Sequence, residues 1–400
     1  MVSTGVTFYL QWEVAAQVWL QNIFSSMGIS IISFFSAFGE EMMMIAIIGF
    51  LYWCWDKEFG KFVAVNTVVA LVANPLVKNI VNRRRPYFDI DNIKCFRKVA
   101  ADADLYDIAE QGYSFPSGHS SNATVAYGSI AVYMKKAWVT ICAVILILLV
   151  GFSRIVVGAH YITDVLGGWV LGIVVLAIVA VLQKKVSNKY ILYAIFLVLG
   201  IPGFFYCTST DFYDSYGMMV GCFTAILFEE KYVNFANTKN VIRIILRLAG
   251  GTALYFVLNS LLKLPFSKEF LESGTTAAML VRTGRKAIVT FIIMGIYPML
   301  FKYTAKIGKH ETAGTAQALE SETLSEDTAE AAAEGVVLEA TKDAETEDTG
   351  TLRATDSGDS GELLFSTEPI VEDPAASRTT DEYMQWVKAQ QAEIDNQEDK

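Results

Sequence analysis

The stretch AWVTICAVILILLVGFSRIVVGAHYITDVLGGWVLGIVVLAIVAVLQ, residues 137–183, decides the fold. Two almost uninterrupted apolar runs, 137–152 and 165–183, flank the polar segment SRIVVGAHYITD at 153–164. An apolar run of roughly 18–20 residues can cross a bilayer, whereas a helix of a soluble domain alternates apolar and polar residues. The pattern predicts two transmembrane helices. It also raises the question of why an arginine, a histidine and an aspartate lie between them.

Similar apolar runs recur over the first three quarters of the chain. Of the 400 residues, 53% are hydrophobic, and the mean hydropathy is positive. We therefore expect an all-α, polytopic membrane protein. Its helices are expected at about 14–37, 41–56, 61–80, 118–134, 137–153, 163–183, 190–206, 214–229, 241–262 and 286–303. The first range contains Glu13, Gln17 and Gln21, so it is the weakest and either spans the membrane or lies in the interface plane.

Charge is divided unevenly along the chain. Residues 311–400 hold 24 acidic against 5 basic residues, a net charge of −19, whereas residues 1–310 hold 18 against 27, a net charge of +9. An acidic segment with few aromatic residues cannot bury enough apolar area to offset the entropy of ordering. We expect a membrane core at 1–186, about four additional transmembrane helices at 187–305 whose role the sequence does not indicate, and a largely disordered acidic tail at 306–400.

Basic residues in alternate loops predict the orientation. Lys57 and Lys61 follow the second expected helix, Lys135 and Lys136 follow the fourth, and lysines at 184, 185 and 189 follow the sixth. By the positive-inside rule these loops and the tail are cytoplasmic. Two loops depart from the rule: 82–117, and 263–286 with its five basic residues.

Other features bear on the cellular setting. The opening residues, 1–13, lack the basic region of a cleavable signal, so we expect insertion into the plasma membrane through the transmembrane helices themselves. Cys95 and Cys207 both fall in loops on the predicted outer side, which leaves a disulfide between them open.

Three polar clusters adjoin the apolar runs. Lys78 and Arg85 stand seven residues apart at the end of the third helix, about two helical turns. Ser117, Gly118 and His119 open the fourth helix, where unpaired N–H groups and a positive dipole end suit an anion. Arg154, His160 and Asp164 form the third cluster, in which a carboxylate four residues after the imidazole could hold its tautomer. Each cluster alone also fits an ordinary basic anchor, a capped helix or a solvated ion pair.

Counting the membrane crossings places all three clusters at one face, the non-cytoplasmic one. Ionisable groups beside apolar helices are costly, so their convergence indicates function. Together they supply cations, two histidines, an aspartate and backbone N–H groups. This set is suited to a phosphate group whose charge is neutralised by lysine and arginine, without a metal site.

Three motifs carry a family resemblance. K-x6-RP from Lys78 to Pro86, PSGH at 116–119 and SR-x5-H-x3-D at 153–164 resemble the signature of the type 2 phosphatidic acid phosphatase (PAP2) superfamily, in its membrane lipid phosphatase branch. The resemblance covers about residues 40–183 and implies a six-helix core. The remaining helices and the tail have no counterpart in that minimal core.

The resemblance also implies roles for the site residues. His160 would be the nucleophile that forms a phosphohistidine, Asp164 would orient it, and His119 would protonate the leaving oxygen. Lys78, Arg85, Ser117, Gly118 and Arg154 would bind the phosphoryl oxygens, with no metal and no cofactor. The substrate would be a membrane lipid phosphate or diphosphate, such as undecaprenyl diphosphate, phosphatidylglycerol phosphate or phosphatidic acid. The segment 87–115 is expected to cover the site.

Two other classes of function stay open. The helices after residue 190 double the membrane domain, so the protein could transport a lipid phosphate, and Arg247 within the ninth helix is the residue that such a function would use. Alternatively, the chain could be a scaffold that binds a protein partner through its tail. We expect the membrane and a lipid phosphate as partners, and no nucleic acid.

Overall fold

The computed structural model of the protein describes residues 5–99 and 103–304. The tail that we predict to be disordered lies outside these residues. Within them the chain forms helices and loops, and its extended pairing is limited to an isolated bridge between Val6 and Arg83. The chain is therefore all-α, as the sequence predicts.

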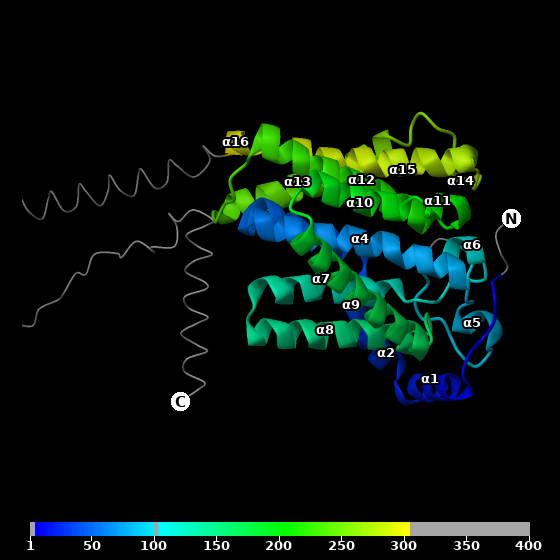
Figure 1. Ribbon diagram of the computed structural model, residues 1–400. Coiled ribbons are helices and arrows are strands. Elements are labelled where there is room, and N and C mark those ends of the chain that lie inside the picture. The colour runs from blue at the N-terminus through cyan, green and yellow to red at the C-terminus, as the bar shows by residue number, and fades with distance from the viewer. Residues whose placement is uncertain (1–4, 100–102, 305–400) are drawn as a thin grey trace, which may run out of the picture. The chain divides into compact units, whose positions relative to one another are not determined.

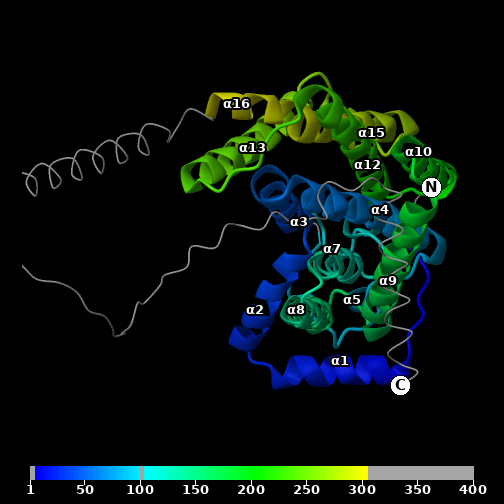
Figure 2. The same ribbon diagram turned by 60° about the vertical axis from the view of Figure 1, so that its left-hand side comes forward.

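The helices up to residue 185 surround one central helix (Figure 2). They are α1 (Gln11–Ile23), α2 (Ser26–Phe34), η1 (Phe35–Gly39), α3 (Glu41–Phe50), η2 (Leu51–Trp55), α4 (Lys57–Val81), α5 (Pro86–Asp89), α6 (Ile108–Gln111), α7 (Gly118–Met134), α8 (Ala137–Val156) and α9 (Ile162–Lys185). The central helix is α7, which packs against α4, α8 and α9. Because it is enclosed by other helices, α7 carries serines and small residues instead of a lipid-facing apolar surface.

The later helices form a layer on the other side of α4 (Figure 1). They are α10 (Lys189–Gly200), α11 (Gly203–Tyr206), α12 (Thr210–Phe228), η3 (Glu229–Val233), α13 (Val241–Leu261), α14 (Lys268–Glu272), α15 (Thr276–Phe291), η4 (Ile292–Ile296), η5 (Tyr297–Leu300) and α16 (Phe301–Thr304). α12 packs against both α4 and α15. A Cβ at Gly217 would lie 2.3 Å from the Thr283 carbonyl oxygen, so glycine permits the close approach of α12 to α15.

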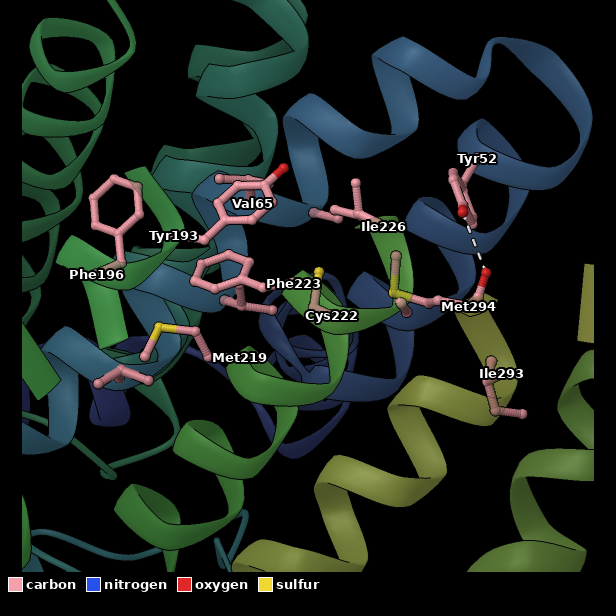
Figure 3. Packing of buried hydrophobic residues seen from close by; sticks show 14 of the residues in the cluster. Tyr52, Val65, Tyr193, Phe196, Met219, Cys222, Phe223, Ile226, Ile293 and Met294 are labelled. Carbon is pink, nitrogen blue, oxygen red and sulfur yellow. Dashed lines mark hydrogen bonds between the residues drawn. The ribbon is translucent and has the colours of Figure 1, made fainter. Parts of the chain in front are cut away.

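A shared apolar core joins the two groups of helices. Figure 3 shows Val65 of α4 and Tyr52 of η2 in the same cluster as Cys222 of α12 and Met294 of η4. The Tyr52 hydroxyl donates to the Met294 carbonyl oxygen at 3.2 Å. The later helices are thus packed onto the first group through buried side chains.

Six helical segments of the described residues are long and apolar enough to cross a membrane. They are 57–81, 137–156, 162–185, 189–206, 241–261 and 276–303, and α1 with α2 would be a seventh if that bent pair is one span. The chain is a polytopic membrane protein. The helices α10, α12, α13 and α15 extend it beyond the six-helix core.

Three local expectations were wrong. The single helix expected at 14–37 is broken, since α1 and α2 meet at an angle of 111° and Ser25 caps α2 by accepting from Gly28 N. The last helix begins ten residues earlier than expected, at Thr276 instead of 286. Cys95 and Cys207 are both free thiols, so the disulfide that the sequence left open is not formed.

Arg247 has a structural environment. Its side chain is buried, and its guanidinium donates to the carbonyl oxygens of Trp53 and Ala236, with the second contact at 3.0 Å. The guanidinium also lies 4.1 Å from the centre of the Phe301 ring. These contacts tie α13 to η2 and to the end of the last helix, and they give Arg247 no opening toward a transport path.

Candidate active site

The three polar clusters meet at one end of the helix bundle. Lys78 lies in the last turn of α4, and Arg85 immediately precedes the proline that begins α5. Ser117 is the N-cap of α7, Arg154 lies in the last turn of α8, and Asp164 lies in the first turn of α9. Each of these side chains is buried.

Backbone contacts fix α7 against α9 at this end. The Ser117 N–H donates to the Asp164 carbonyl oxygen at 2.9 Å. A Cβ at Gly168, one turn further along α9, would lie 2.6 Å from the Ser117 carbonyl oxygen. Only glycine allows this approach, which sets the N-terminus of α7 beside the segment that carries His160.

His160 lies in the loop between α8 and α9, and not on a helix as the four-residue spacing suggested. Gly158 adopts a φ of 80°, which turns the chain after α8. Arg85 Nη1 lies 3.2 Å from His160 Nε2. Because a guanidinium can only donate, Nε2 accepts this contact and the ring proton belongs to Nδ1. The unprotonated Nε2 is therefore the nitrogen available for nucleophilic attack.

Asp164 faces the other ring nitrogen through a short network. Its Oδ2 lies 3.6 Å from His160 Nδ1, beyond hydrogen-bond distance, and it accepts from the Ser114 hydroxyl and from Tyr161 N at 2.8 Å. Ser114 Oγ lies 3.5 Å from His160 Nδ1. Ser114 thus stands between the carboxylate and the imidazole, a role that the sequence pattern did not reveal.

Arg83 is the second residue that the motifs did not reveal. Its guanidinium donates to Asp164 Oδ1 and to Glu13 Oε1, each at 2.6 Å, and all three side chains are buried. The guanidinium also stacks 4.0 Å from the centre of the Tyr161 ring. Asp164 therefore has a fully formed ion pair with Arg83, and its charge is balanced before any substrate binds.

The N-terminal helix closes this network from outside. Gln17 is buried and donates to the carbonyl oxygens of Ile155 and His160, at 2.8 and 3.1 Å. Gln21 donates to the carbonyl oxygens of Lys94 and Val156. The polar residues that made this helix a weak candidate for a membrane span thus hold the loop that carries His160.

A cavity of about 310 Å³ opens beside His160 Nε2. Lys78, Arg85, Gly118, His119 and His160 line it, together with Asp211, Asp214 and Ser215 of α12. Lys78 Nζ is 4.0 Å from Asp211 Oδ2, and a Cβ at Gly118 would lie 3.9 Å from the same nitrogen. A lysine and the N-terminus of a helix thus face the same small volume.

The cations at the cavity are only partly balanced. Arg85 donates to the carbonyl oxygens of Gln111, Gly112 and Ala159, at 2.9 to 3.0 Å, and forms no ion pair with a described residue. Arg154 is buried, its Nε lacks a partner, and it forms no ion pair with the described part of the chain. Buried cations without carboxylates favour an anionic ligand.

The same cations act on His160. Burial lowers the pKa of its imidazole well below the ordinary value, and Arg85, Arg154 and Lys78 lower it further by charge repulsion. The imidazole is consequently neutral near pH 7, as a nucleophile must be.

The segment 87–115 covers the site, as expected. It supplies the Gln111 and Gly112 carbonyls that hold Arg85, the Ser114 hydroxyl, and Val99 in the cavity wall. Among the described residues, no cluster of three or more His, Cys, Asp or Glu side chains is placed to hold a metal ion.

Comparisons with known proteins match two parts of the chain. Residues 59–187 match the family model described as PAP2 superfamily, and residues 213–309 match the one described as PAP2 superfamily phosphatase, transmembrane extension. Phosphatidylglycerophosphatase B of Bacillus subtilis is 30% identical over 185 residues, which is 43% of this chain and 79% of that protein. Undecaprenyl-diphosphatase of Sulfolobus acidocaldarius is 27% identical over 141 residues, 35% of this chain and 63% of that protein.

A solved structure is also similar. It is described as the first transmembrane PAP2 type phosphatidylglycerolphosphate phosphatase from Bacillus subtilis, and it is 23% identical. The match covers 44% of this chain and 89% of that one, with a TM-score of 0.35.

Proposed function

The chain belongs to the PAP2 superfamily, and we propose that it hydrolyses a membrane lipid phosphate or diphosphate through a phosphohistidine at His160. One observation supports this most directly. The buried cations Lys78, Arg85 and Arg154 gather around the unprotonated Nε2 of a neutral histidine, and the carboxylate nearest to His160 is already paired with Arg83.

In the first step, His160 Nε2 attacks the phosphorus, and the bond from phosphorus to the leaving oxygen breaks. His119, which lines the same cavity, donates the proton that the leaving oxygen takes. Lys78, Arg154 and the N–H groups at the start of α7 stabilise the charge on the equatorial oxygens. Ser117 caps that helix and aims its N-terminus.

Substrate binding must also displace one contact of the free protein. Arg85 Nη1 occupies the lone pair of Nε2 at 3.2 Å, so the arginine has to release it before attack. A phosphoryl oxygen is the acceptor that can take over this N–H. Arg85 then binds the substrate and exposes the nucleophile in the same movement.

In the second step, His119 removes a proton from water, and the water oxygen attacks the phosphorus of the phosphohistidine. The P–N bond breaks, inorganic phosphate leaves, and His160 returns to its neutral form. During both steps Asp164 and Ser114 stand beside Nδ1, where positive charge develops on the phosphorylated ring.

We also propose the setting of the reaction. The alternating basic loops place the site at the non-cytoplasmic face of the plasma membrane and the tail in the cytoplasm, where it could bind a protein partner. Residues 1–186 form the catalytic core, 187–305 extend it, and 306–400 form the tail. Labelling of single cysteines in intact cells, at residue 91 for the outer side and at residue 184 for the inner side, tests this orientation.

The reaction is tested by phosphate release from purified protein in detergent, with EDTA present, on undecaprenyl diphosphate, phosphatidylglycerol phosphate and phosphatidic acid. We expect release that EDTA does not reduce and that His160→Ala abolishes. A label from the substrate phosphate should be trapped at His160 as an acid-labile adduct. Release that requires a metal, or that survives in His160→Ala, would overturn the proposed mechanism.

A further inference from the structure

The catalytic cavity is not closed on the side of α12. Two of its lining residues, Glu41 and Leu71, also line a second cavity of about 90 Å³ between the core and the later helices. Side chains of α3, α4, α12 and α15 form its walls, among them Ile45, Val68 and Val289. The cavity that holds the phosphate site therefore continues into an apolar space.

A third cavity, of about 180 Å³, extends this space toward the outside of the bundle. It shares Ile45, Gly49, Trp53, Tyr255 and Ile293 with the second cavity. It lies between α3 and α13, and the exposed residues Met42 and Ala46 of α3 are at its edge. We name the second and third cavities together the apolar slot.

Charge is confined to the end of the apolar slot nearest the catalytic cavity. Lys286 Nζ lies 3.4 Å from Glu41 Oε1 and 3.6 Å from Asp214 Oδ2. Glu41 and Asp214 also line the catalytic cavity. A ligand that fits both spaces must therefore be anionic at one end and apolar along the rest of its length, as a lipid phosphate is.

We propose that the apolar slot binds one hydrocarbon chain of the lipid whose phosphate reacts at His160, and that α12, α13 and α15 of the transmembrane extension form its outer wall. This inference rests on the proposed function. The slot is narrow, so it holds a single chain while any other chain stays in the bilayer. The extension thereby selects the substrate by its chain, because contacts inside the slot depend on the fit of the chain to these side chains.

Ile45 is the position at which the inference is tested, because it lines both parts of the apolar slot. Ile45→Trp should obstruct the slot without touching the catalytic residues. The matched control is Ile173→Trp on α9, where the side chain is 60% exposed on the outside of the bundle. Each variant is assayed on phosphatidic acid with two oleoyl chains and on phosphatidic acid with two hexanoyl chains.

We expect Ile45→Trp to lower kcat/KM for the oleoyl substrate by at least about tenfold, the effect of losing contact with roughly two methylene groups. The rate on the hexanoyl substrate should persist, which also shows that the variant is folded. Ile173→Trp should change neither rate. Equal effects of Ile45→Trp on the two substrates would overturn the inference.

A second measurement does not depend on turnover. Phosphatidic acid with a photoactivatable group at the end of one chain is bound to His160→Ala, irradiated, and the labelled peptides are identified. Labels on α3, α12, α13 or α15 support the apolar slot, and labels confined to α8 and α9 contradict it. If the unaltered protein releases phosphate from neither substrate, the proposed function fails for this lipid, while the labelled positions still decide where the chain binds.

Discussion

Arg83 should be the most sensitive non-catalytic residue of the site. Its side chain is only 2% exposed, and it pairs with Glu13 and Asp164 at 2.6 Å each. Arg83→Met leaves two buried carboxylates without a counter-ion. Breaking a buried ion pair by removing one partner costs about 3–5 kcal/mol, and here one substitution breaks two.

The neighbouring arginine provides a matched control. Arg84 pairs with Asp89 at 3.0 Å, but its side chain is 31% exposed. A pair in contact with solvent contributes roughly 0–1 kcal/mol, so Arg84→Met should have little effect. The two variants remove the same group from adjacent positions and differ in burial and in the number of partners.

Thermal unfolding in detergent and phosphate release together measure the outcome. Arg83→Met should lower both the melting temperature and kcat, because Asp164 and the loop that carries His160 lose their support. Adding Glu13→Gln to Arg83→Met should recover part of the stability, since one of the two unpaired carboxylates is then neutral. The reasoning is refuted if Arg83→Met is as stable as Arg84→Met, or if Glu13→Gln destabilises the double variant further.

Three further predictions concern the catalytic cavity. Because burial and then the charge of Arg85 lower the pKa of His160, the acidic limb of kcat/KM should lie below about pH 6.5, the ordinary value for histidine, and Arg85→Gln should move that limb to higher pH; pH profiles of the two proteins on one lipid check the sign. Arg154→Met should lower kcat/KM by about a hundredfold through the loss of a phosphate contact, yet leave the melting temperature of the free protein unchanged or higher, because it removes a buried charge that lacks a carboxylate. Gly168→Val should lower activity and stability, since its Cβ would lie 2.6 Å from the Ser117 carbonyl oxygen, whereas Gly284→Val, where the structure has open space, should affect neither; unfolding and phosphate release of both variants test this.

The sequence predicted the class of fold and the meeting of the three clusters, because both follow from local patterns. Apolar runs of sufficient length fix the helices, and the number of crossings fixes which helix ends share a face. The break between α1 and α2 did not follow in this way. A serine after an apolar run is compatible with a continuing helix, and only the packing of α1 against α8 and α9 makes the bend necessary.

The missing parts of the site have a common physical origin. Glu13, Arg83 and Ser114 reach Asp164 from segments that lie 151, 81 and 50 residues away along the chain, and no periodic pattern encodes such contacts. Glu13 gave a partial signal, since a carboxylate in an apolar helix needs a partner. A single sequence does not show that this partner is Arg83 and not the interface of the membrane.

Arg83 and Arg85 show why the run RRRP carries two different functions within three residues. Arg83 is saturated by two carboxylates, so its positive charge is cancelled and it has none to offer a phosphate. Arg85 is held by three neutral carbonyl oxygens, which fix its position and leave its charge uncompensated. An anion that enters the cavity is therefore attracted by Arg85 and not by Arg83, although both are buried near His160. The same division keeps Asp164 from neutralising the phosphate-binding cations, because its charge is spent on Arg83. Exchanging the partners of these two arginines would abolish the site without changing its composition, which is why the contacts of each arginine, and not the number of arginines, define the function.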